Sequence, residues 1–501
     1  MKNYIFQLIL IINLLIIASC SKNHSAKEAK TWPQFRGINC SGLAAEDARP
    51  PIEFSDKTLL WKIVLPAGHS SPVVWDDKIF LTAFIKDSSE LQTICIKRKN
   101  GKIIWKQSIL PEKIEGYHSI SNAAMASPVT DGEHIYVYFG SYGILCYDFN
   151  GGLVWEYKIN VHPYRWGVSS SPIIYKDYLI LSRDISKERQ VIALNKRTGE
   201  IIWKIELPNV NNTWTTNWTT PVIYKDQIIL HRAGEIASYS VNDGHRIWWL
   251  PYLTSGTSTP VINNNMIYIG TWHNFSENEL RANFQQYFDF YKLVKDFDLN
   301  QDGFIQKEEI PDTLLIYTRP GIEDLEGASN TVKQNFGTFD KNKNGAIDKF
   351  EWEETVKWTT SSFYKEAGLI ALNPSEEGEL TMNNIVWREP EKVPEVPSPM
   401  IYRNLIYMCK EGGILTCMDA EKGTILYRER IGASGPYFAS PVAANGYIYF
   451  ASGKGVITVI KAGNKLNIAK QSNLKEDIFA SPLIIDNAFY VRTVGHLYAF
   501  K

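Results

Sequence analysis

Two twelve-residue segments carry oxygen-bearing side chains at a spacing that suits one task, the binding of a hard cation. Calcium takes roughly six to eight oxygen ligands from carboxylates, amides and backbone carbonyls. Both segments offer such groups at positions 1, 3, 5, 9 and 12 and a backbone carbonyl at position 7. The predicted ligands of the first segment are Asp298, Asn300, Asp302, Phe304 (through its carbonyl), Gln306 and Glu309. Those of the second are Asp340, Asn342, Asn344, Ala346 (through its carbonyl), Asp348 and Glu351.

Each segment matches the calcium loop of an EF-hand position by position. Gly303 and Gly345 allow the tight bend at position 6. Ile305 and Ile347 at position 8 are expected to pair in a short strand that joins the two loops. We therefore expect two calcium ions, held weakly enough for a structural role outside the cell, since each loop offers three carboxylates. The alternative is a degenerate insertion that binds no metal.

The residues around these loops have helical rather than strand periodicity. Apolar side chains ahead of the first loop share one face of a predicted helix, namely Leu280, Phe284, Tyr287, Phe288, Tyr291, Val294 and Phe297. Pro311 is expected in the first turn of a helix that leaves the first loop, where proline is tolerated. Residues 276–362 are thus predicted to form a small all-α domain that carries the EF-hand pair.

The rest of the chain is repetitive. A Ser-Pro or Thr-Pro doublet precedes a β-rich apolar stretch eight times, with first residues Ser71, Ser127, Ser171, Thr220, Thr259, Ser398, Ser440 and Ser481. Repeats of roughly 40–50 residues with four short strands each are typical of a β-propeller. The one long interval, between Thr259 and Ser398, contains the EF-hand pair and places it between the second and third strands of the fifth unit.

The two ends of the chain complement each other. The last unit stops at Lys501 without a fourth strand, and Leu59-Leu60-Trp61-Lys62 can supply that strand and remove the open sheet edge. We therefore expect an all-β eight-bladed β-propeller, with the small all-α EF-hand domain inserted in blade five. Residues 51–275 would form blades one to five together with the closing strand, and residues 363–501 would complete blades five to eight.

When the repeat units are aligned, two further positions carry similar residues in most units. A large aromatic residue in the fourth strand is interpreted as packing between blades, and its positions are Trp105, Trp155, Trp203, Trp248, Trp387 and Tyr427. The third strands align a column of small residues: Cys95, Cys146, Ala193, Ser240, Ala371, Cys417, Val459 and Ala499. Its cysteines are interpreted as buried fillers, with a Cys409–Cys417 disulfide left open. Cys40 stands alone, and no cysteine spacing predicts zinc or haem.

The first twenty residues contain one early lysine, a long apolar run and the sequence Ala18-Ser19-Cys20. This pattern predicts a secretory signal peptide, and its end resembles a bacterial lipobox, which implies lipidation of Cys20. An uncleaved membrane anchor is the alternative. Residues 21–50 would form a tether and an N-terminal segment, and Ser21 after the cysteine favours the outer membrane. The net charge of −1 gives no reason to expect nucleic acid as a partner.

The repeat unit from Ser171 to Trp203 resembles the pyrroloquinoline-quinone (PQQ) type of propeller repeat, on its Ser-Pro, Ala-Leu-Asn and Thr-Gly-x-x-x-Trp positions. The resemblance covers about residues 50–275 and 363–501, and Trp32-Pro-Gln-Phe-Arg-Gly37 is similar to the start of many such bacterial propellers. The superfamily contains quinone-dependent alcohol dehydrogenases and non-enzymatic BamB-like scaffold lipoproteins. Its dehydrogenases use a vicinal disulfide, a Glu/Asn/Asp metal set and an Asp base. Adjacent cysteines are lacking here and no segment matches the metal set, which argues against PQQ as a cofactor.

The loops before the doublets carry aromatic and arginine side chains, which are common anchors of binding surfaces. The predicted ligand face consists of His69, Arg165, Trp166, Trp214, Trp218 and Tyr437, unless these rings only plug the channel. We assign no catalytic residue. The sequence favours a monomeric, calcium-binding cell-envelope lipoprotein that binds a protein or glycan as a non-enzymatic scaffold. The alternative is a PQQ-dependent or carbohydrate-active enzyme with its site on the propeller face beneath the EF-hand domain.

Overall fold

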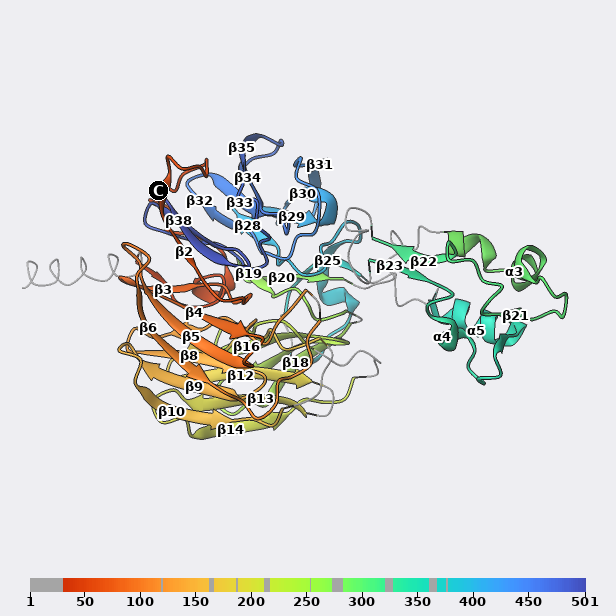
Figure 1. Ribbon diagram of the computed structural model, residues 1–501, viewed down its shortest axis with the longest axis horizontal. Helices are drawn as coiled ribbons and strands as arrows, with labels where there is room; N and C mark the ends of the chain where they lie inside the picture. Colours follow the sequence, from red (N-terminus) through yellow and green to blue (C-terminus); the bar gives the residue numbers. More distant parts are fainter. Residues whose placement is uncertain are drawn as a thin grey trace, which may run out of the picture.

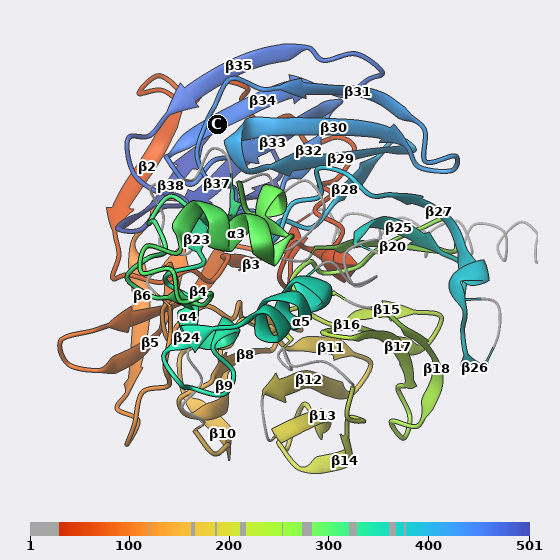
Figure 2. The same cartoon turned by 90° about the vertical axis from the view of Figure 1, so that its right-hand side faces the viewer.

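The computed structural model describes residues 30–118, 120–161, 166–185, 188–210, 217–252, 254–272, 283–319, 328–359, 367–374 and 377–501. Eight antiparallel sheets stand around a common axis, and the inserted domain projects from one end of that axis (Figure 1 and Figure 2). The predicted eight-bladed β-propeller with an inserted EF-hand domain is confirmed.

The first four blades follow one another along the chain, each beginning with its innermost strand. The strands of blades one and two are β3 (Val73–Trp75), β4 (Lys78–Ile85), β5 (Glu90–Lys97), β6 (Ile103–Ile109), β7 (Val129–Thr130), β8 (His134–Phe139), β9 (Gly143–Asp148) and β10 (Leu153–Lys158). Those of blades three and four are β11 (Ile173–Tyr175), β12 (Tyr178–Ile185), β13 (Glu188–Asn195), β14 (Ile201–Glu206), β15 (Val222–Tyr224), β16 (Gln227–Arg232), β17 (Glu235–Ser240) and β18 (Arg246–Pro251).

Blades five to seven repeat the same order, with the insertion inside blade five. Their strands are β19 (Val261–Asn263), β20 (Met266–Thr271), β25 (Gly368–Leu372), β27 (Ile385–Glu389), β28 (Met400–Tyr402), β29 (Leu405–Lys410), β30 (Ile414–Asp419), β31 (Ile425–Arg430), β32 (Val442–Ala444), β33 (Tyr447–Ala451), β34 (Val456–Lys461) and β35 (Ile468–Asn473). Short additions are β26 (Gly378–Glu379), parallel to β18, and the 3-10 turns η4 (Met382–Asn384) and η5 (Glu411–Gly413).

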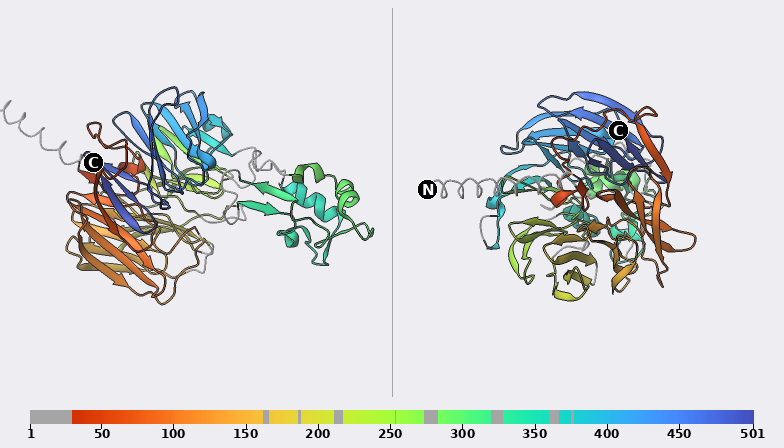
Figure 3. Two further views of the ribbon diagram at one scale, coloured as in Figure 1. Left: turned by 45° about the horizontal axis from the view of Figure 1, so that its top comes forward. Right: turned by 90° about the vertical axis from the view of Figure 1, so that its left-hand side faces the viewer.

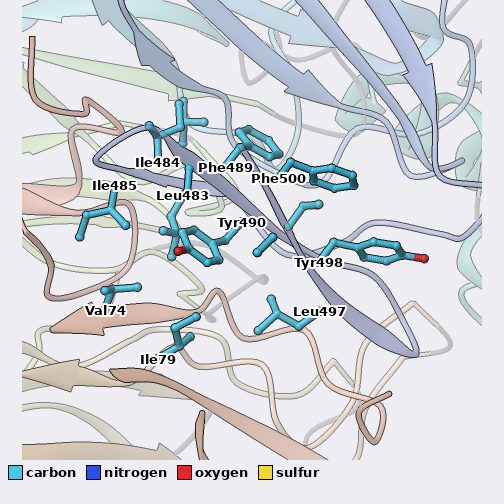
Figure 4. Close-up of a cluster of buried hydrophobic side chains, with 14 of the residues drawn as sticks. Val74, Ile79, Leu483, Ile484, Ile485, Phe489, Tyr490, Leu497, Tyr498 and Phe500 are labelled. Carbon is cyan, nitrogen blue, oxygen red and sulfur yellow. The ribbon is translucent and has the colours of Figure 1, made fainter. Parts of the chain in front are cut away.

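Blade eight joins the two ends of the chain, as predicted. It contains β36 (Leu483–Ile485), β37 (Ala488–Arg492), β38 (His496–Phe500) and the early strand β2 (Leu59–Val64). β2 pairs antiparallel with β38, from Leu59 opposite Phe500 to Val64 opposite His496. Side chains of this blade pack with Val74 and Ile79 of blade one, as Figure 4 shows. The ring of blades is therefore closed by strand pairing and by a shared core.

A ring of hydrogen bonds runs around the axis through all eight doublets. The backbone N–H of each Ser or Thr donates to the hydroxyl oxygen of the next doublet, over 2.9–3.2 Å, and the ring closes from Ser481 to Ser71. Each of the eight residues thus supplies one acceptor and one donor. This explains the residue type, because only a hydroxyl side chain this short accepts at that place and the following proline has no N–H to satisfy.

The predicted packing of the aromatic column between blades is confirmed. The indole Nε1 of Trp155 donates to the carbonyl of Lys196 in the next blade over 3.1 Å, and four other tryptophans of this type make the same bond. Each ring also covers the turn glycine of the next blade; a Cβ on Gly199 would lie 2.6 Å from Trp155. Trp248 is the exception and bonds to Gln227 of its own blade.

The column of small residues lies directly opposite these aromatic residues. Cys95 pairs with Trp105, Cys146 with Trp155 and Ala499 with Trp61, so a small side chain leaves room for each large ring. In blade four the prediction was wrong by two residues. Ser238, rather than Ser240, faces Trp248, because the turn glycine follows the column position by about six residues in that blade as in blades one and three.

The N-terminal segment crosses the end of the axis opposite the inserted domain (Figure 1 and Figure 3). β1 (Thr31–Trp32) pairs with β3 of blade one, and the 3-10 turn η1 (Ile38–Cys40) follows it. Asn39 then bonds to the backbone of Ile223 in blade four, and Leu43 pairs with Ala443 in blade seven. These contacts reach widely separated blades, so the segment fills the channel from that end.

The inserted domain has less helix than the sequence predicted. It contains η2 (Asn283–Tyr287), α3 (Phe290–Phe297), β21 (Ile305–Gln306), β22 (Leu315–Thr318), β23 (Ser329–Thr331), α4 (Phe336–Phe339), β24 (Ala346–Ile347) and α5 (Lys349–Thr359). The predicted helix over 280–297 is broken, because the carboxylate of Asp289 accepts the N–H of Tyr291 and starts α3 afresh. Leu280 lies outside the described residues.

The prediction of a helix directly after the first loop is also wrong. Pro311 instead lies in a turn, with the N–H of Leu314 donating to its carbonyl, and the chain continues into the β22–β23 hairpin. Hairpin side chains such as Ile316 and Val332 join Phe284, Leu293 and Trp352 in one apolar core. The hairpin therefore occupies the place that the missing helix would have filled.

We predict that replacing Gly199 with alanine lowers the free energy of unfolding by about 2 kcal/mol or more. Gly199 has a φ of +75°, and a Cβ would come within 2.6 Å of the Trp155 ring. Urea denaturation followed by tryptophan fluorescence measures the change. Gly463→Ala is the matched control, because a Cβ there meets no atom within 4 Å. Equal stability of the two variants would contradict the packing role given to the Trp–Gly contact.

Candidate functional site: the EF-hand loops and the adjoining propeller face

The first EF-hand loop folds around the carboxylate of Asp298. Its oxygens accept the backbone N–H groups of Gln301, Asp302 and Gly303. Gln301 and Gly303 have φ angles of +62° and +84°, so the chain bends sharply at positions 4 and 6. Asp302 accepts the N–H of Phe304, which is the largest cause of the lowered pKa of that carboxyl. The backbone thus wraps the position-1 and position-5 carboxylates as a calcium loop requires.

The second loop repeats this geometry. Asp340 accepts the N–H groups of Asn344 and Gly345, and Gly345 has a φ of +91°. Asp348 and Glu351 exchange hydrogen bonds between side chain and backbone, which forms a capping box at the start of α5. Ile305 and Ile347 pair across the two loops, as predicted, through β21 and β24.

The donor set of both loops fits calcium. All predicted ligand atoms are carboxylate, amide or carbonyl oxygens, which a hard cation prefers. Within the described residues, no three His, Cys, Asp or Glu side chains gather closely enough to hold a metal by themselves. The carboxylates of Glu309 and Glu351 accept backbone N–H groups at positions 2, 3 and 9 of their own loops. Calcium binding at these loops would draw the two glutamates away from those amides.

In the described residues, the EF-hand pair has only part of the helix set that a calcium switch moves. In sensor EF-hands, calcium swings an entering and an exiting helix apart and exposes an apolar groove. Here the first loop has only its entering helix α3, and the entering helix of the second loop, α4, is a single turn. The β22–β23 hairpin packs into the core instead. The arrangement therefore suits stabilisation by calcium better than opening.

An ionic joint connects the hairpin to the propeller. The guanidinium of Arg319, just after β22, donates to the carboxylates of Glu395 and Glu411 and lies 5.0 Å from the centre of the Trp272 ring. Burial raises the pKa of Glu411, but the charges of Arg319 and Lys410 outweigh it and hold the pKa below its ordinary value. The joint thus fixes the insertion to blades five and six at three points.

The structure separates the predicted ligand-face residues. Arg165 and Trp214 lie outside the described residues, as does Cys20 of the predicted lipidation site. Trp166 stacks on His118 at 4.5 Å, and Tyr437 does not reach the face, because it is buried and donates to the carbonyl of Ala433. His69 and Trp218 remain at the mouth of the channel.

The mouth itself follows a rule that sequence reasoning missed. The residue two positions before each Ser or Thr of a doublet is half-buried in every blade, whereas the doublets beneath are buried. These mouth residues are His69, Met125, Ser169, Trp218, Thr257, Val396, Phe438 and Phe479. Phe438 and Phe479 stack at 5.3 Å, and Phe479 stacks on His69 at 4.5 Å. Counting back two residues from each doublet finds them, once the doublets are known to form the ring beneath the mouth.

The aromatic mouth is uncharged at neutral pH. Burial, with the nearby charge of Arg492, lowers the pKa of His69 to about 3. The imidazole therefore stays neutral and stacks as a ring beside Phe479. Together with Met125 of blade two, the stacked residues form an apolar arc across blades seven, eight, one and two. The opposite side of the mouth is mixed, with Ser169, Trp218, Thr257 and Val396.

A buried ionic network lies between blades three and four on the same face. Arg232 donates to Asp184 over 2.7 Å and to Glu235, and Arg246 bonds to Glu235 over 3.3 Å. The positive and negative groups pair with each other. Arg183 forms a separate ion pair with Glu188. These charges are thus largely engaged in holding neighbouring strands together.

Glu115 lies on the same face but does not take part in that network of ion pairs. It borders a small hollow lined by residues that include Ser170, Ser182, Arg183 and Asn217. Burial raises the pKa of Glu115 to about 8, although Arg183 and the N–H of Val168 act in the other direction. Within the part of the chain that the structure describes, Glu115 Oε1, Asn217 Nδ2 and the two serine hydroxyls have no protein partner. This is the most perturbed carboxyl of the face.

The cysteines outside the signal segment are free and buried: Cys40, Cys95, Cys146, Cys409 and Cys417. The disulfide left open between Cys409 and Cys417 is not formed, because their strands pair in a register that puts Leu415 opposite Cys409. Cys40 lies in the 3-10 turn η1 and is buried. Among the described residues, no helix has the length and apolar character needed to cross a membrane.

We predict that Glu115→Gln stabilises the protein relative to the native chain as the pH rises. The folded pKa of Glu115, about 8, lies above the ordinary value of 4.5. Folding therefore takes up a proton between these values, and the native chain loses stability as the pH rises from about 5 to about 8. Urea denaturation at pH 5 and pH 8 should give a difference between variant and native chain that grows by about 1 kcal/mol or more. A difference independent of pH would contradict the assigned protonation of Glu115.

Comparisons with known proteins agree with this architecture. Residues 91–275 match the family model described as outer membrane protein assembly factor BamB, and residues 295–310 and 333–357 match the EF-hand model. The search of curated proteins found no significant match.

Several solved structures share the fold at low sequence identity. BamB from Moraxella catarrhalis is 11% identical with a TM-score of 0.54, over 89% of this chain and 97% of that one. A europium-containing methanol dehydrogenase is 11% identical with a TM-score of 0.57, over 95% and 98%. A quinohemoprotein alcohol dehydrogenase from Comamonas testosteroni is 10% identical with a TM-score of 0.55, over 95% and 81%. The chain is therefore a β-propeller whose residues 91–275 match the BamB family model and whose insertion matches the EF-hand model.

Proposed function

We propose that this protein is a calcium-binding scaffold of the bacterial cell envelope, which binds a protein or glycan partner at the mouth of its propeller. The observation that carries the proposal is the position of the EF-hand pair. Its hairpin is fixed by Arg319 to Glu395 and Glu411 on the same face as the aromatic mouth. An ordered insertion beside a half-exposed aromatic arc is an arrangement suited to recognition.

We infer two calcium sites, one in each loop. The ligands would be Asp298, Asn300, Asp302, Phe304, Gln306 and Glu309 in the first and Asp340, Asn342, Asn344, Ala346, Asp348 and Glu351 in the second. The left-handed residues at positions 4 and 6 support both assignments. Calcium would neutralise the carboxylates of each loop and stabilise the small core behind them.

The role of calcium in this proposal is structural. The hairpin that replaces the missing helix continues directly to Arg319, so the packing of the loops and the joint to the propeller share one rigid element. Calcium would therefore fix the orientation of the domain over the mouth. The three carboxylates of each loop are consistent with the weak affinity of extracellular sites, roughly 10⁻⁴–10⁻³ M.

The partner would contact the apolar arc of the mouth. Phe438, Phe479 and His69 form one continuous stack with half-exposed edges. Aromatic side chains of this kind anchor both protein and carbohydrate partners. The BamB-like repeats favour a protein partner in the envelope. The chain would act as a monomer.

The predicted lipid anchor is consistent with this orientation. The described chain begins at residue 30, on the end of the axis opposite the EF-hand domain (Figure 3). If Cys20 carries acyl chains in the outer membrane, residues 21–29 would tether the plugged end toward the bilayer. The aromatic mouth and the EF-hand domain would then face away from the membrane and toward a partner.

An enzymatic alternative is favoured by one observation. Glu115 has a raised pKa beside a polar hollow on the same face, and perturbed carboxyls of this kind occur at catalytic sites. A quinone-dependent dehydrogenase or a carbohydrate-active enzyme would use such a group. Titration with pyrroloquinoline quinone in the presence of calcium separates the functions. The scaffold proposal predicts no quinone uptake, and stoichiometric uptake would replace it with the enzymatic one.

We predict that Glu309→Gln together with Glu351→Gln abolishes calcium binding, while each single variant loses one of two sites. A neutral amide at position 12 removes the bidentate ligand on which the site depends. Isothermal titration calorimetry of the chain from residue 21 measures the number of sites. Circular dichroism should show an unchanged propeller in each variant.

Glu308→Gln together with Glu353→Gln is the matched control, because both side chains are exposed neighbours of the predicted ligands. This control should keep both sites. Two sites of unchanged affinity in the position-12 double variant would contradict the ligand assignment.

A further inference from the structure

The hydroxyl groups of the axial ring have an unused hydrogen-bond donor. Each hydroxyl oxygen accepts the N–H of the preceding doublet, from Ser71 around to Ser481. In the described part of the chain, however, none of the eight O–H groups donates to a protein acceptor. All eight residues keep between 2% and 4% of their surface exposed. The ring therefore offers its protons to whatever occupies the channel that it encloses.

Arg36 of the N-terminal segment enters this channel from the plugged end. Its side chain is completely buried, and its Nη2 donates to the carbonyl of Pro399 over 2.9 Å, in one of the ring doublets. A Cβ placed on Gly42 would lie 3.2 Å from the same nitrogen and 2.9 Å from the carbonyl of Pro441, in the next doublet. The guanidinium thus lies beside the doublets of blades six and seven.

The positive charge of Arg36 has no acidic partner. Nε and Nη1 have no hydrogen-bond acceptor, and no carboxylate among the described residues forms an ion pair with this side chain. Cys40 is the nearby ionisable group, but burial raises the pKa of its thiol to about 12, so the thiol is neutral. Burial lowers the pKa of Arg36 only to about 10, so the guanidinium stays charged at neutral pH.

A buried, unpaired guanidinium is costly, because both its charge and its N–H groups lose water. Water in the channel would satisfy the N–H groups but would supply no opposite charge. The carbonyl of Pro399 accepts from Nη2 of Arg36, and the carbonyl of Pro441 lies near the same nitrogen. Nε and Nη1 of Arg36 still have no acceptor, and the hydroxyls of Ser398 and Ser440 in the adjoining doublets donate to no acceptor among the described residues. One positive charge with more donors than acceptors favours an anion.

We propose that Arg36, with the hydroxyls of Ser398 and Ser440, holds a small monovalent inorganic anion such as chloride in the axial channel. The anion accepts from Nε and Nη1 of Arg36 and from the ring hydroxyls on that side. It binds only the folded chain, because the unfolded chain has no ring. The anion thus stabilises the closure of the propeller around its N-terminal segment.

Crystals of the chain from residue 21, grown in sodium bromide, test the proposal by anomalous diffraction. One bromide peak is expected within hydrogen-bonding reach of Arg36 Nε and Nη1. Arg36→Gln should lose this peak. Arg49→Gln should keep it, because Arg49 is an exposed arginine of the same segment whose Nη1 donates to the carbonyls of Glu46 and Ala48. A map with bromide only at surface residues and none at Arg36 would contradict the proposal.

Thermal unfolding provides a second test, which begins with the native chain. At constant ionic strength, replacing sodium gluconate with sodium chloride should raise the Tm of the native chain by roughly 1–2 °C for each tenfold excess of chloride over its dissociation constant. Arg36→Gln should show no such dependence and should equal or exceed the native Tm in gluconate, since it removes an unpaired charge. An identical Tm of the native chain in both salts would overturn the anion site.

Discussion

The hydrogen-bonded ring of Ser-Pro and Thr-Pro doublets is the constraint on which this structure depends. Eight backbone N–H groups donate to eight hydroxyl oxygens in one direction around the axis, and the last donor returns to Ser71. A closed ring fixes the number of blades and leaves no sheet edge open. The strand β2 completes the same closure at the circumference by pairing with β38. Inner ring and outer strand therefore make the propeller a single cooperative unit.

This closure explains why the chain tolerates a large insertion. The doublets before and after the EF-hand domain, at Thr259 and Ser398, still exchange a hydrogen bond of 3.1 Å. Blade five keeps its four strands, because the insertion leaves after β20 and returns at β25. The domain is then attached through the β22–β23 hairpin and Arg319 rather than through its own helices. Under the proposed function, calcium in the EF-hand loops would orient the domain without altering the blades.

Most of the architecture is readable from the sequence because it is repeated. The doublets gave the number of blades and the place of the insertion, and the two loop motifs gave the EF-hand pair. The same repetition gave a wrong alignment in blade four, where Ser240 was assigned to the column of small residues in place of Ser238. Hydrogen bonds between doublets could not be inferred from spacing, because they join residues that only the folded ring brings together. The mouth residues follow from the doublets only once that ring is known.

The errors in the inserted domain have a different cause. Helical periodicity across 280–297 concealed the break at Asp289, because a capping aspartate fits either the interior of a polar helical face or the start of a new helix. The hairpin after the first loop replaces an expected helix. Its strand β22 has two adjacent buried residues, Ile316 and Tyr317, and such a short apolar run fits either a helix or a strand. Sequence patterns of this length do not distinguish a helix from a strand. Tertiary packing against Phe284 and Trp352 does.

The buried arginine of the N-terminal segment was invisible for a similar reason. The sequence shows Arg36 in a short motif near the start, and only the fold places it under the ring of hydroxyls. The same holds for Glu115, whose raised pKa depends on its burial in the folded protein. Charges and protonation states belong to the assembled site, so they are the part of function that this sequence could not reveal.

Hydrogen–deuterium exchange of the chain with and without calcium tests the central claim most directly. The account predicts slower exchange in both loops, 298–309 and 340–351, and in the β22–β23 hairpin, with no segment of the domain core becoming more exposed. Faster exchange in α3 or α5 on calcium addition would show an opening switch and contradict the structural role. Unchanged exchange in both loops would contradict calcium binding itself.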